Sequence, residues 1–341
     1  MLKLLFLGFG NVGQALAKLL IDKKSYLEEK YGFFYKPVGI VDINLGSVCN
    51  NDGINLEKSL EMVENGKSLN DLPGGITGLS ALDAIDKINA DVLLEATYTD
   101  IKTGEPATTH VKNALNKGMH VVTTNKGPVA LFSKELLKLA ADNGVNFLFE
   151  GTIMSGTPML NLVRETLAGS DIKCVQGILN GTTNFILTKM EEGMKYENAL
   201  QLAQELGYAE AVPDADVKGW DALAKATILA NVIFNEPLKP DDIPCEGITG
   251  LTPDDIELAG KENSRYKLIA RVEKTAGKVS ASVRPQKMKL SHPLASVSGA
   301  TNALTITSDT LGDVTISGPG AGRIETGFSM LIDLLAIRSK L

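Results

Sequence analysis

The segment 203–225 concentrates the side chains that are best suited to chemistry. Its ionisable groups are Glu210, Asp214, Asp216, Lys218, Asp221 and Lys225. Ala222 to Phe234 is mostly apolar and predicts a helix, on which Asp221 and Lys225, four residues apart, share one face. A solvated surface pair is one interpretation, but the apolar helix favours a face that points into a cleft. Carboxylates that bind an ammonium group, beside an amine that moves a proton, suit a small zwitterionic substrate.

A glycine-rich turn near the N-terminus predicts a dinucleotide site. Leu2 to Leu7 is typical of a buried parallel strand, and helical periodicity begins at Gln14. The turn between them has the G-x-G-x-x-G pattern, and this strand–turn–helix context makes a purely structural glycine turn the weaker interpretation. In such a turn, the glycines allow a tight bend, close approach of a pyrophosphate and close helix packing, while the helix N-terminus binds phosphate. The expected cofactor contacts in this turn are Gly8, Gly10, Asn11, Val12 and Gly13.

Asp42 follows a predicted second strand over residues 37–41. A carboxylate at this position accepts hydrogen bonds from the adenosine ribose and repels a 2′-phosphate. Residues 43–57 contain no Arg or Lys that could bind such a phosphate. The sequence therefore favours NAD over NADP, and the alternative is that Asp42 only begins a turn.

Two more predicted strands, 90–96 and 119–123, are followed by polar residues. Loops after the carboxyl ends of parallel strands face the ligand crevice of an open sheet. We therefore expect Thr97 to contact the cofactor and Lys126 to lie beside the nicotinamide, although a lysine in a loop is often merely solvated. The next helix is predicted over residues 133–143.

The second half predicts a different kind of sheet. Alternating stretches within residues 265–317 are typical of antiparallel strands. A strand over 173–179 leads into the polar turn 180–184, whose backbone donors and hydroxyls suit a carboxylate. The other interpretation of this turn, compatible with the first, is that Thr182 or Thr183 caps a helix. After a glycine loop that includes Gly322, an expected cofactor contact, the helix 325–338 should pack back on the first domain.

These patterns predict an α/β protein of two domains. The first is a Rossmann-type doubly wound parallel sheet over residues 1–149, completed by the returning segment 318–341. The second is an α+β domain over 150–317, with a mostly antiparallel sheet, for substrate binding. A chain of 341 residues is long enough for two such cores.

Charge and cysteine content narrow the functional class. A net charge of −7 disfavours nucleic-acid binding, and the apolar runs are too short for a membrane helix. Cys49, Cys174 and Cys245 are isolated, without disulfide or metal-site spacing, and no secretion signal is evident. We therefore expect a protein of the reducing cytoplasm that acts on a small molecule.

Along nearly its whole length, the chain resembles the homoserine dehydrogenases. The matching segments are 8–13, 120–126, 150–158, 180–184, 203–225 and 318–335. The match over 203–225 is the specific one, since it reproduces the family spacing A-x3-G-Y-A-E-A followed by P-x2-D-V-x-G-x-D-x3-K. Val212, Glu325 and the stretch 154–157 depart from the usual pattern and indicate a divergent branch.

The resemblance implies NAD(P)-dependent interconversion of L-homoserine and L-aspartate 4-semialdehyde, a step in threonine, methionine and isoleucine biosynthesis. By position, Lys225 and Asp221 would meet the reacting hydroxyl or aldehyde. Lys126 would lie between nicotinamide and substrate and is the rival candidate for the acid/base catalyst. The implied substrate-binding residues are Glu210 and Asp216 for the ammonium group, and Gly181 with Thr182 for the carboxylate.

The resemblance also implies features beyond the substrate site. It implies a homodimer formed through the sheet of the second domain. We expect no appended regulatory domain, because the chain ends just after the closing helix. A monovalent cation would be bound by backbone oxygens of Glu150, Ile153, Ser155 and Thr157.

Three other functions remain open at this point. A phosphorylating aspartate-semialdehyde dehydrogenase needs a nucleophilic cysteine, and the acidic segment contains none. An L-aspartate dehydrogenase would differ in its substrate. A dinucleotide-binding redox sensor would not need Lys126, Asp221 and Lys225 together.

Overall fold

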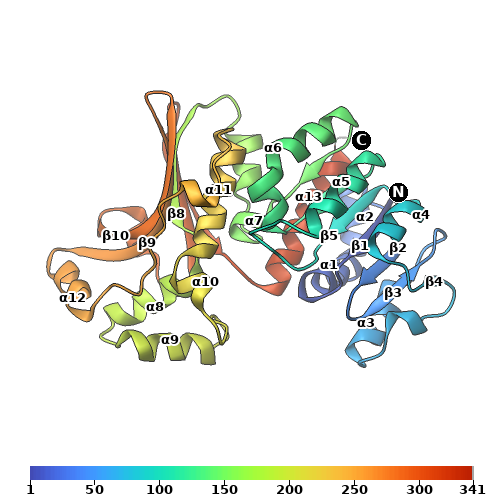
Figure 1. Cartoon of the computed structure of the whole chain (residues 1–341), viewed down its shortest axis with the longest axis horizontal. Coiled ribbons are helices and arrows are strands. Elements are labelled where there is room, and N and C mark those ends of the chain that lie inside the picture. The colour runs from blue at the N-terminus through green and yellow to red at the C-terminus, as the bar shows by residue number, and fades with distance from the viewer. Residues whose placement is uncertain (340–341) are drawn as a thin grey trace. The chain divides into compact units, whose positions relative to one another are not determined.

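The computed structural model describes residues 1–339 and divides into two compact units (Figure 1). Unit 1 comprises residues 1–156 and the chain from 322 onward, and unit 2 comprises residues 157–321. The boundaries predicted from the sequence, 149 and 317, precede the observed ones, 156 and 321, by seven and four residues.

Unit 1 contains a seven-stranded sheet in the order β4-β3-β2-β1-β5-β6-β7. Its strands are β1 (Leu2–Leu7), β2 (Tyr35–Asp42), β3 (Gly46–Cys49), β4 (Ile76–Thr77), β5 (Val92–Glu95), β6 (His120–Thr123) and β7 (Phe147–Leu148). Within the run β2-β1-β5-β6-β7, every pair of neighbouring strands is parallel, which confirms the doubly wound fold. The edge strands β3 and β4 are antiparallel, and their four and two residues were too short to predict from periodicity.

The register brings the ends of four parallel strands to one edge of this sheet. Leu7 is level with Val41 and with Glu95, and Glu95 is level with Thr123. The loops after β1, β2, β5 and β6 therefore leave the sheet together. This is the edge at which an open α/β sheet binds its ligand.

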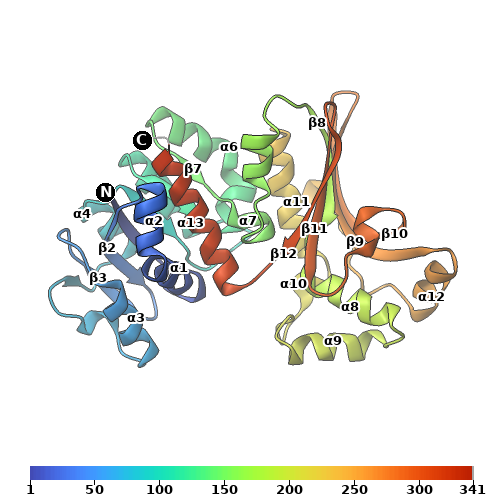
Figure 2. The ribbon, with the colours of Figure 1, turned by 180° about the vertical axis from the view of Figure 1, so that it is seen from behind.

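Helices cover both faces of this sheet (Figure 2). They are α1 (Asn11–Asp22), α2 (Lys24–Tyr31), α3 (Leu56–Glu64), α4 (Ala81–Lys87), α5 (Ala107–Asn116), α6 (Lys126–Asp142), α7 (Gly151–Met154) and α13 (Arg323–Ser339), with the short turn η1 (Leu69–Asp71). Leu16 and Leu20 of α1 and Leu334 of α13 are buried in one core with the strands. The C-terminal helix therefore belongs to the first core, as the sequence predicted.

Helix α6 begins seven residues before the predicted start at residue 133. Pro128 lies in the first turn of this helix, where proline is tolerated because its missing N–H would have no intrahelical acceptor. The Asn125 side chain caps the helix by accepting from the N–H of Gly127 at 3.2 Å. Lys126 is thus the first residue of a helix and does not lie in a loop.

Unit 2 contains a five-stranded sheet in the order β10-β9-β8-β11-β12, and every neighbouring pair is antiparallel. Its strands are β8 (Ile172–Ile178), β9 (Ser264–Thr275), β10 (Lys278–Lys289), β11 (Thr301–Ser308) and β12 (Gly312–Pro319). Its helices are α8 (Gly181–Glu191), α9 (Tyr196–Glu205), α10 (Asp214–Val217), α11 (Trp220–Ile233) and α12 (Pro253–Lys261), with η3 (Pro240–Asp242) and η4 (Pro293–Ser296). The π-helical segment η2 (Leu162–Thr166) precedes β8. The α+β arrangement is confirmed.

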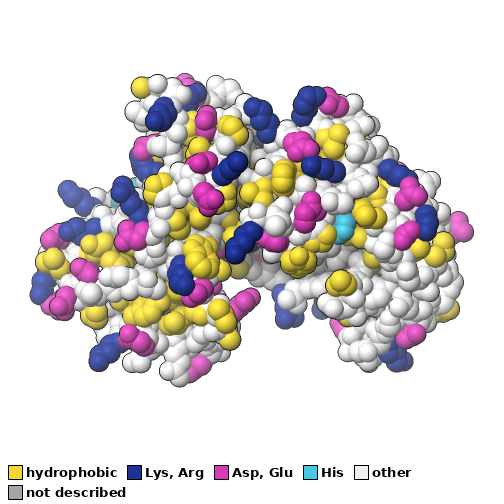
Figure 3. All heavy atoms as spheres, viewed as in Figure 1, with side chains coloured by type: hydrophobic (Ala, Val, Ile, Leu, Met, Phe, Trp, Pro, Cys, Tyr) yellow, Lys and Arg dark blue, Asp and Glu magenta, His cyan; other side chains and the backbone are white. Residues whose placement is uncertain are grey.

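The surface in Figure 3 shows acidic and basic side chains interspersed over both units. No helix within residues 1–339 is long and apolar enough to cross a membrane.

Candidate active site

The glycine turn after β1 is shaped by two of its three glycines. Gly8 has a φ of 85°, and a Cβ there would lie 2.3 Å from the carbonyl oxygen of Ala96. A Cβ on Gly13 would lie 2.5 Å from the carbonyl oxygen of Gly8. A Cβ on Gly10, in contrast, would meet no atom within 4 Å. The fold of unit 1 therefore requires Gly8 and Gly13, whereas Gly10 leaves open backbone at the start of α1, as a bound pyrophosphate would need.

Asp42 lies at the end of β2 and contacts this turn. One carboxylate oxygen accepts from the N–H of Phe9 at 2.8 Å. The other accepts from the N–H groups of Asn44 and Leu45 at 2.8 and 3.0 Å. This carboxylate therefore begins a turn and also lies against the glycine-rich segment.

Glu95 is a fully buried carboxylate at the end of β5. One oxygen accepts from the N–H and the hydroxyl of Thr97, and the other accepts from the Thr123 hydroxyl at 2.8 Å. Asn125 continues this network, because its N–H donates to the Thr123 hydroxyl and its side-chain amide donates to the carbonyl of Tyr98 at 2.9 Å. Thr97 and the start of α6 are thus fixed to each other through Glu95.

Lys126 follows Asn125 as the first residue of α6 and is half-buried. A cation at a helix N-terminus meets the positive end of the helix dipole, which is unfavourable. The helix dipole therefore gives no reason for a lysine at this position.

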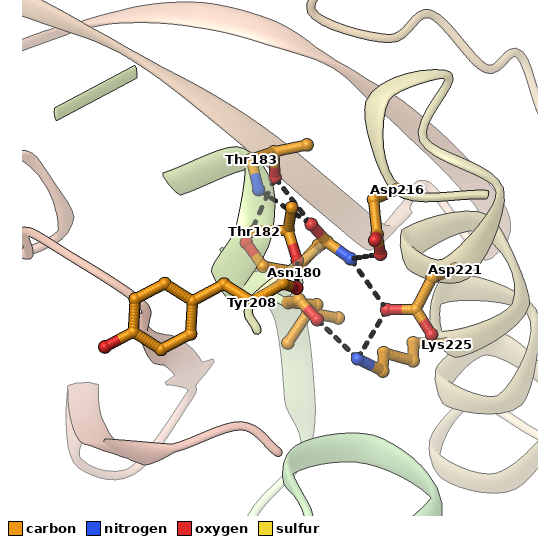
Figure 4. Close-up of polar contacts among 8 residues, drawn as sticks. Asn180, Thr182, Thr183, Tyr208, Asp216, Asp221 and Lys225 are labelled. Atoms are coloured by element: carbon orange, nitrogen blue, oxygen red, sulfur yellow. Dashed lines mark hydrogen bonds and ion pairs between the residues drawn. The ribbon is translucent and has the colours of Figure 1, made fainter. Parts of the chain in front are cut away.

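In unit 2, Asn180 joins the end of β8 to the start of α8 (Figure 4). Its side-chain oxygen accepts from the N–H of Thr183 at 2.9 Å, so Asn180 caps the helix. The expectation that Thr182 or Thr183 would act as the cap was wrong, because the helix begins at Gly181 and places both threonines inside its first turn. The Asn180 amide nitrogen donates to Asp216 at 2.6 Å and to Asp221 at 3.1 Å.

Lys225 completes this group from one turn further along α11. Its ammonium donates to Asp221 at 2.7 Å and to the carbonyl oxygen of Leu179 at 2.5 Å, and only 6% of the residue is exposed. The predicted shared face of Asp221 and Lys225 is confirmed. We call Asn180, Asp216, Asp221 and Lys225 the Asn180 cluster; it holds two carboxylates and one amine.

Asp216 is the carboxylate of the cluster that Lys225 does not contact directly. Burial raises the pKa of this carboxyl, and the neighbouring charge of Asp221 raises it further, while the hydrogen bond from Asn180 opposes both effects. An added cation would relieve this crowding of negative charge. The cluster therefore suits an ammonium group on its ligand.

The remaining predicted substrate residues differ in burial and in hydrogen bonding. Thr182 is buried, and its hydroxyl donates to the carbonyl of Tyr208 at 2.6 Å, so its proton is already engaged. Gly181 is the first residue of α8, where a backbone N–H is available to an anion. Glu210 is exposed, and its backbone carbonyl accepts from the side chain of Gln204.

The other predicted residues lie outside the cluster. Gly322 precedes α13 with a φ of 134°, and a Cβ there would lie 2.0 Å from the Glu325 carboxylate. Of the residues expected to bind a cation, Glu150, Ile153 and Ser155 lie in unit 1 and Thr157 begins unit 2. Within residues 1–339, no group of three or more His, Cys, Asp or Glu side chains is arranged to hold a metal ion.

Sequence reasoning missed the roles of Asn180 and Glu95. An asparagine between a predicted strand and a helix is a strong N-cap signal and could have identified Asn180. A glutamate that ends an apolar strand, as Glu95 does, is unusual for a buried position and could also have been noted.

Comparison with known proteins gives matches over both units. A model of the homoserine dehydrogenase family matches residues 158–335, and a model of the homoserine dehydrogenase NAD-binding domain matches residues 8–150. The chain is 47% identical to an NAD(+)-dependent homoserine dehydrogenase of Pseudomonas canavaninivorans over 98% of this chain and 96% of that protein.

Solved structures agree in fold. The chain is similar to a putative homoserine dehydrogenase of Archaeoglobus fulgidus, with a TM-score of 0.89, 35% identity and 99% of each chain covered. It is also similar to a hyperthermophilic archaeal homoserine dehydrogenase in complex with NADPH, with a TM-score of 0.84 and 31% identity over 100% of this chain and 98% of that one.

Proposed function

The chain belongs to the homoserine dehydrogenase family and is an NAD(P)-dependent oxidoreductase, and we propose that the Asn180 cluster binds its amino-acid substrate and moves the reaction's proton. The reaction interconverts L-homoserine and L-aspartate 4-semialdehyde. When bound, the nicotinamide accepts the hydride from C4 of homoserine. The protein must bind and orient the amino acid and accept the hydroxyl proton.

Lys225 is the proposed proton acceptor. The observation that carries this role is the buried contact of its amine with Asp221 and the carbonyl of Leu179, which fixes the amine in one position. A fixed amine within reach of a hydroxyl can take its proton as hydride leaves. Asp221 would orient the lysine and stabilise it after proton transfer.

Asp216 is the proposed partner of the substrate ammonium, together with Glu210. With Lys225 unprotonated, as a proton acceptor must be, the two carboxylates give the cluster two negative charges, and the substrate ammonium would neutralise one of them. The N–H groups at Gly181 and Thr182 would bind the substrate carboxylate, since the start of a helix favours anions.

Lys126 of unit 1 is the second candidate for proton transfer. Its place at the start of α6, held by the Glu95 and Asn125 network, supports a functional role rather than a structural one.

We also propose that NAD is the preferred cofactor. Asp42 offers a carboxylate where a 2′-phosphate would be repelled, and the relative from Pseudomonas canavaninivorans is named as NAD(+)-dependent. The archaeal relative in complex with NADPH shows that the family also accepts the phosphorylated cofactor.

Three further properties follow the family expectation. Glu150, Ile153 and Ser155 are buried in and around α7, and Ser155 has a φ of 51°. This supports the monovalent cation that the family implies at these residues and Thr157. The exposed edge strand β12 of the five-stranded sheet supports a homodimer. The three free cysteines support a reducing cytoplasm.

One assay tests the reaction and the cofactor preference together. Oxidation of NADH with L-aspartate 4-semialdehyde is measured and repeated with NADPH, with L-aspartate and NAD as the control for an amino-acid dehydrogenase. We expect a higher kcat/KM with NADH and no reaction of L-aspartate. A higher kcat/KM with NADPH would remove the proposed preference.

A further inference from the structure

The side-chain amide of Asn302 is buried without a partner. Asn302 has no exposed surface, and neither its oxygen nor its nitrogen makes a hydrogen bond within the described chain. Buried polar atoms in proteins are almost always paired, and an unpaired amide is costly. A ligand or a water molecule is the kind of partner that such a group lacks.

Asn302 is the second residue of β11 and lies between two glycines. A Cβ built on Gly320 would lie 2.0 Å from the Asn302 amide nitrogen. A Cβ built on Gly181 would lie 3.4 Å from the amide oxygen. The amide thus lies close to the bare backbone of both glycines, and Gly181 is the first residue of α8.

The start of α8 attracts an anion to this place. The helix has 11 residues, and the first N–H groups of a helix lack intrahelical acceptors and carry the positive end of its dipole. The cap, Asn180, accepts from Thr183, which leaves the earlier N–H groups at Gly181 and Thr182 for a ligand. The Asn302 atom nearest to Gly181 is the amide oxygen, but no hydrogen bond holds either polar atom of this amide. A half-turn of the amide group places its nitrogen there and adds another donor.

A neighbouring amide shows what a structural asparagine looks like in this region. Asn184, one turn along α8, donates to the carbonyl groups of Val297, Gly299 and Thr301 at 3.3, 2.9 and 3.2 Å. Its nitrogen holds the segment before β11 against the helix. The Asn302 amide makes no such contact, so packing of this segment does not explain it.

We propose that Asn302 is a further substrate-binding residue, whose amide nitrogen donates to the carboxylate of the amino acid at the first turn of α8. This assignment rests on the proposed function and extends it from the helix N-terminus to the sheet. It also makes Asn302 a specificity residue, since the interaction is lost for substrates without a carboxylate.

The test compares two substrates in three proteins. Homoserine oxidation by the wild type, Asn302→Ala and Asn302→Asp is measured beside that of 3-aminopropan-1-ol, which is homoserine without its carboxylate. Loss of a hydrogen bond to a charged group should raise the KM for homoserine about 10- to 100-fold in Asn302→Ala. The kcat and the KM for the cofactor should change less than about twofold, because neither depends on carboxylate binding.

The aspartate variant gives the sharper signature. Asn302→Asp keeps the shape of the side chain but faces the substrate carboxylate with a like charge, so its KM for homoserine should exceed that of Asn302→Ala. Neither variant should bind 3-aminopropan-1-ol more weakly than the wild type does. If this compound is turned over too slowly, its inhibition constant against homoserine gives the same comparison.

Thermal unfolding separates binding from structure. Asn302→Ala removes no hydrogen bond of the protein and should keep its Tm, whereas Asn184→Ala should lower it. An unchanged KM for homoserine in both Asn302 variants, or equal losses for the two compounds, would overturn the proposal and indicate a buried water. Failure of the wider proposed function would instead show as full activity in Lys225→Ala.

Discussion

Replacing Lys225 with alanine tests the central chemical assignment. The change removes the amine that lies 2.7 Å from Asp221 and 2.5 Å from the carbonyl oxygen of Leu179. Loss of a general base costs about 10²- to 10⁴-fold in rate, so we expect kcat for homoserine oxidation to fall by that factor. The KM for the cofactor should stay within about twofold, because the cofactor is expected to bind mainly to unit 1.

The same change should cost stability, and this cost has to be measured beside the rate. Removing one partner of a buried ion pair costs about 3–5 kcal/mol. We expect the lower end, because the Asp221 side chain is 21% exposed and keeps its hydrogen bond from Asn180. Lys225→Met keeps the apolar stem of the side chain and should lose as much activity with a smaller loss of stability.

The chain offers a matched control only seven residues away. Lys218 pairs with Asp214 at 2.6 Å with the same spacing of four residues, but their side chains are 47% and 45% exposed. Exposed pairs contribute about 0–1 kcal/mol, so Lys218→Ala should leave both kcat and stability nearly unchanged. Equal losses of kcat in the two variants would mean that kcat depends on the total charge of this segment and not on Lys225 in particular.

The pH dependence separates Lys225 from Lys126. Homoserine oxidation needs an unprotonated base. The kcat should therefore rise with pH over the range in which that base loses its proton. If Lys225 is the base, Lys225→Ala loses this rise and Lys126→Ala keeps it, with a higher KM for homoserine. The opposite pattern would refute the assignment and leave Lys225 as a group that positions the substrate.

Asp216→Asn should raise the KM for homoserine about tenfold or more, the scale for losing a hydrogen bond to a charged group. Burial raises the pKa of Asp216, so the protonated carboxyl stabilises the folded state. This contribution is fully present below the unfolded pKa of about 3.9 and is lost as pH rises through the folded pKa. Urea unfolding should therefore show Asp216→Asn to be more stable than the wild type at pH 7, by a margin that shrinks in acid. Asp42→Ala should narrow the preference for NAD, and an unchanged ratio of kcat/KM for the two cofactors would remove Asp42 from the ribose site. Glu95→Gln should lower the free energy of unfolding by about 1–3 kcal/mol, because an amide cannot accept from Thr97 and Thr123 on both sides; an unchanged urea midpoint would contradict the structural role of this buried carboxylate.

Local pattern determined much of this protein. The spacing of the glycines, read with the strand before it and the helix after it, identified the dinucleotide turn. The four-residue spacing of Asp221 and Lys225 placed both on one helical face, and the ion pair of the structure confirms it. Alternation along residues 265–317 predicted the antiparallel sheet. Each of these features depends on residues that are neighbours in the chain, so periodicity is enough to find them.

Tertiary structure alone decided which distant groups meet. Lys225 donates to the carbonyl of Leu179, 46 residues earlier, and Asn180 donates to Asp216 and Asp221, 36 and 41 residues later. The contact of Asp42 with Phe9 spans 33 residues. The unpaired amide of Asn302 could not be seen in the sequence at all, because an amide is known to lack a partner only after every nearby group has been placed. Such contacts depend on strand order and register, which residue pattern along the chain does not encode.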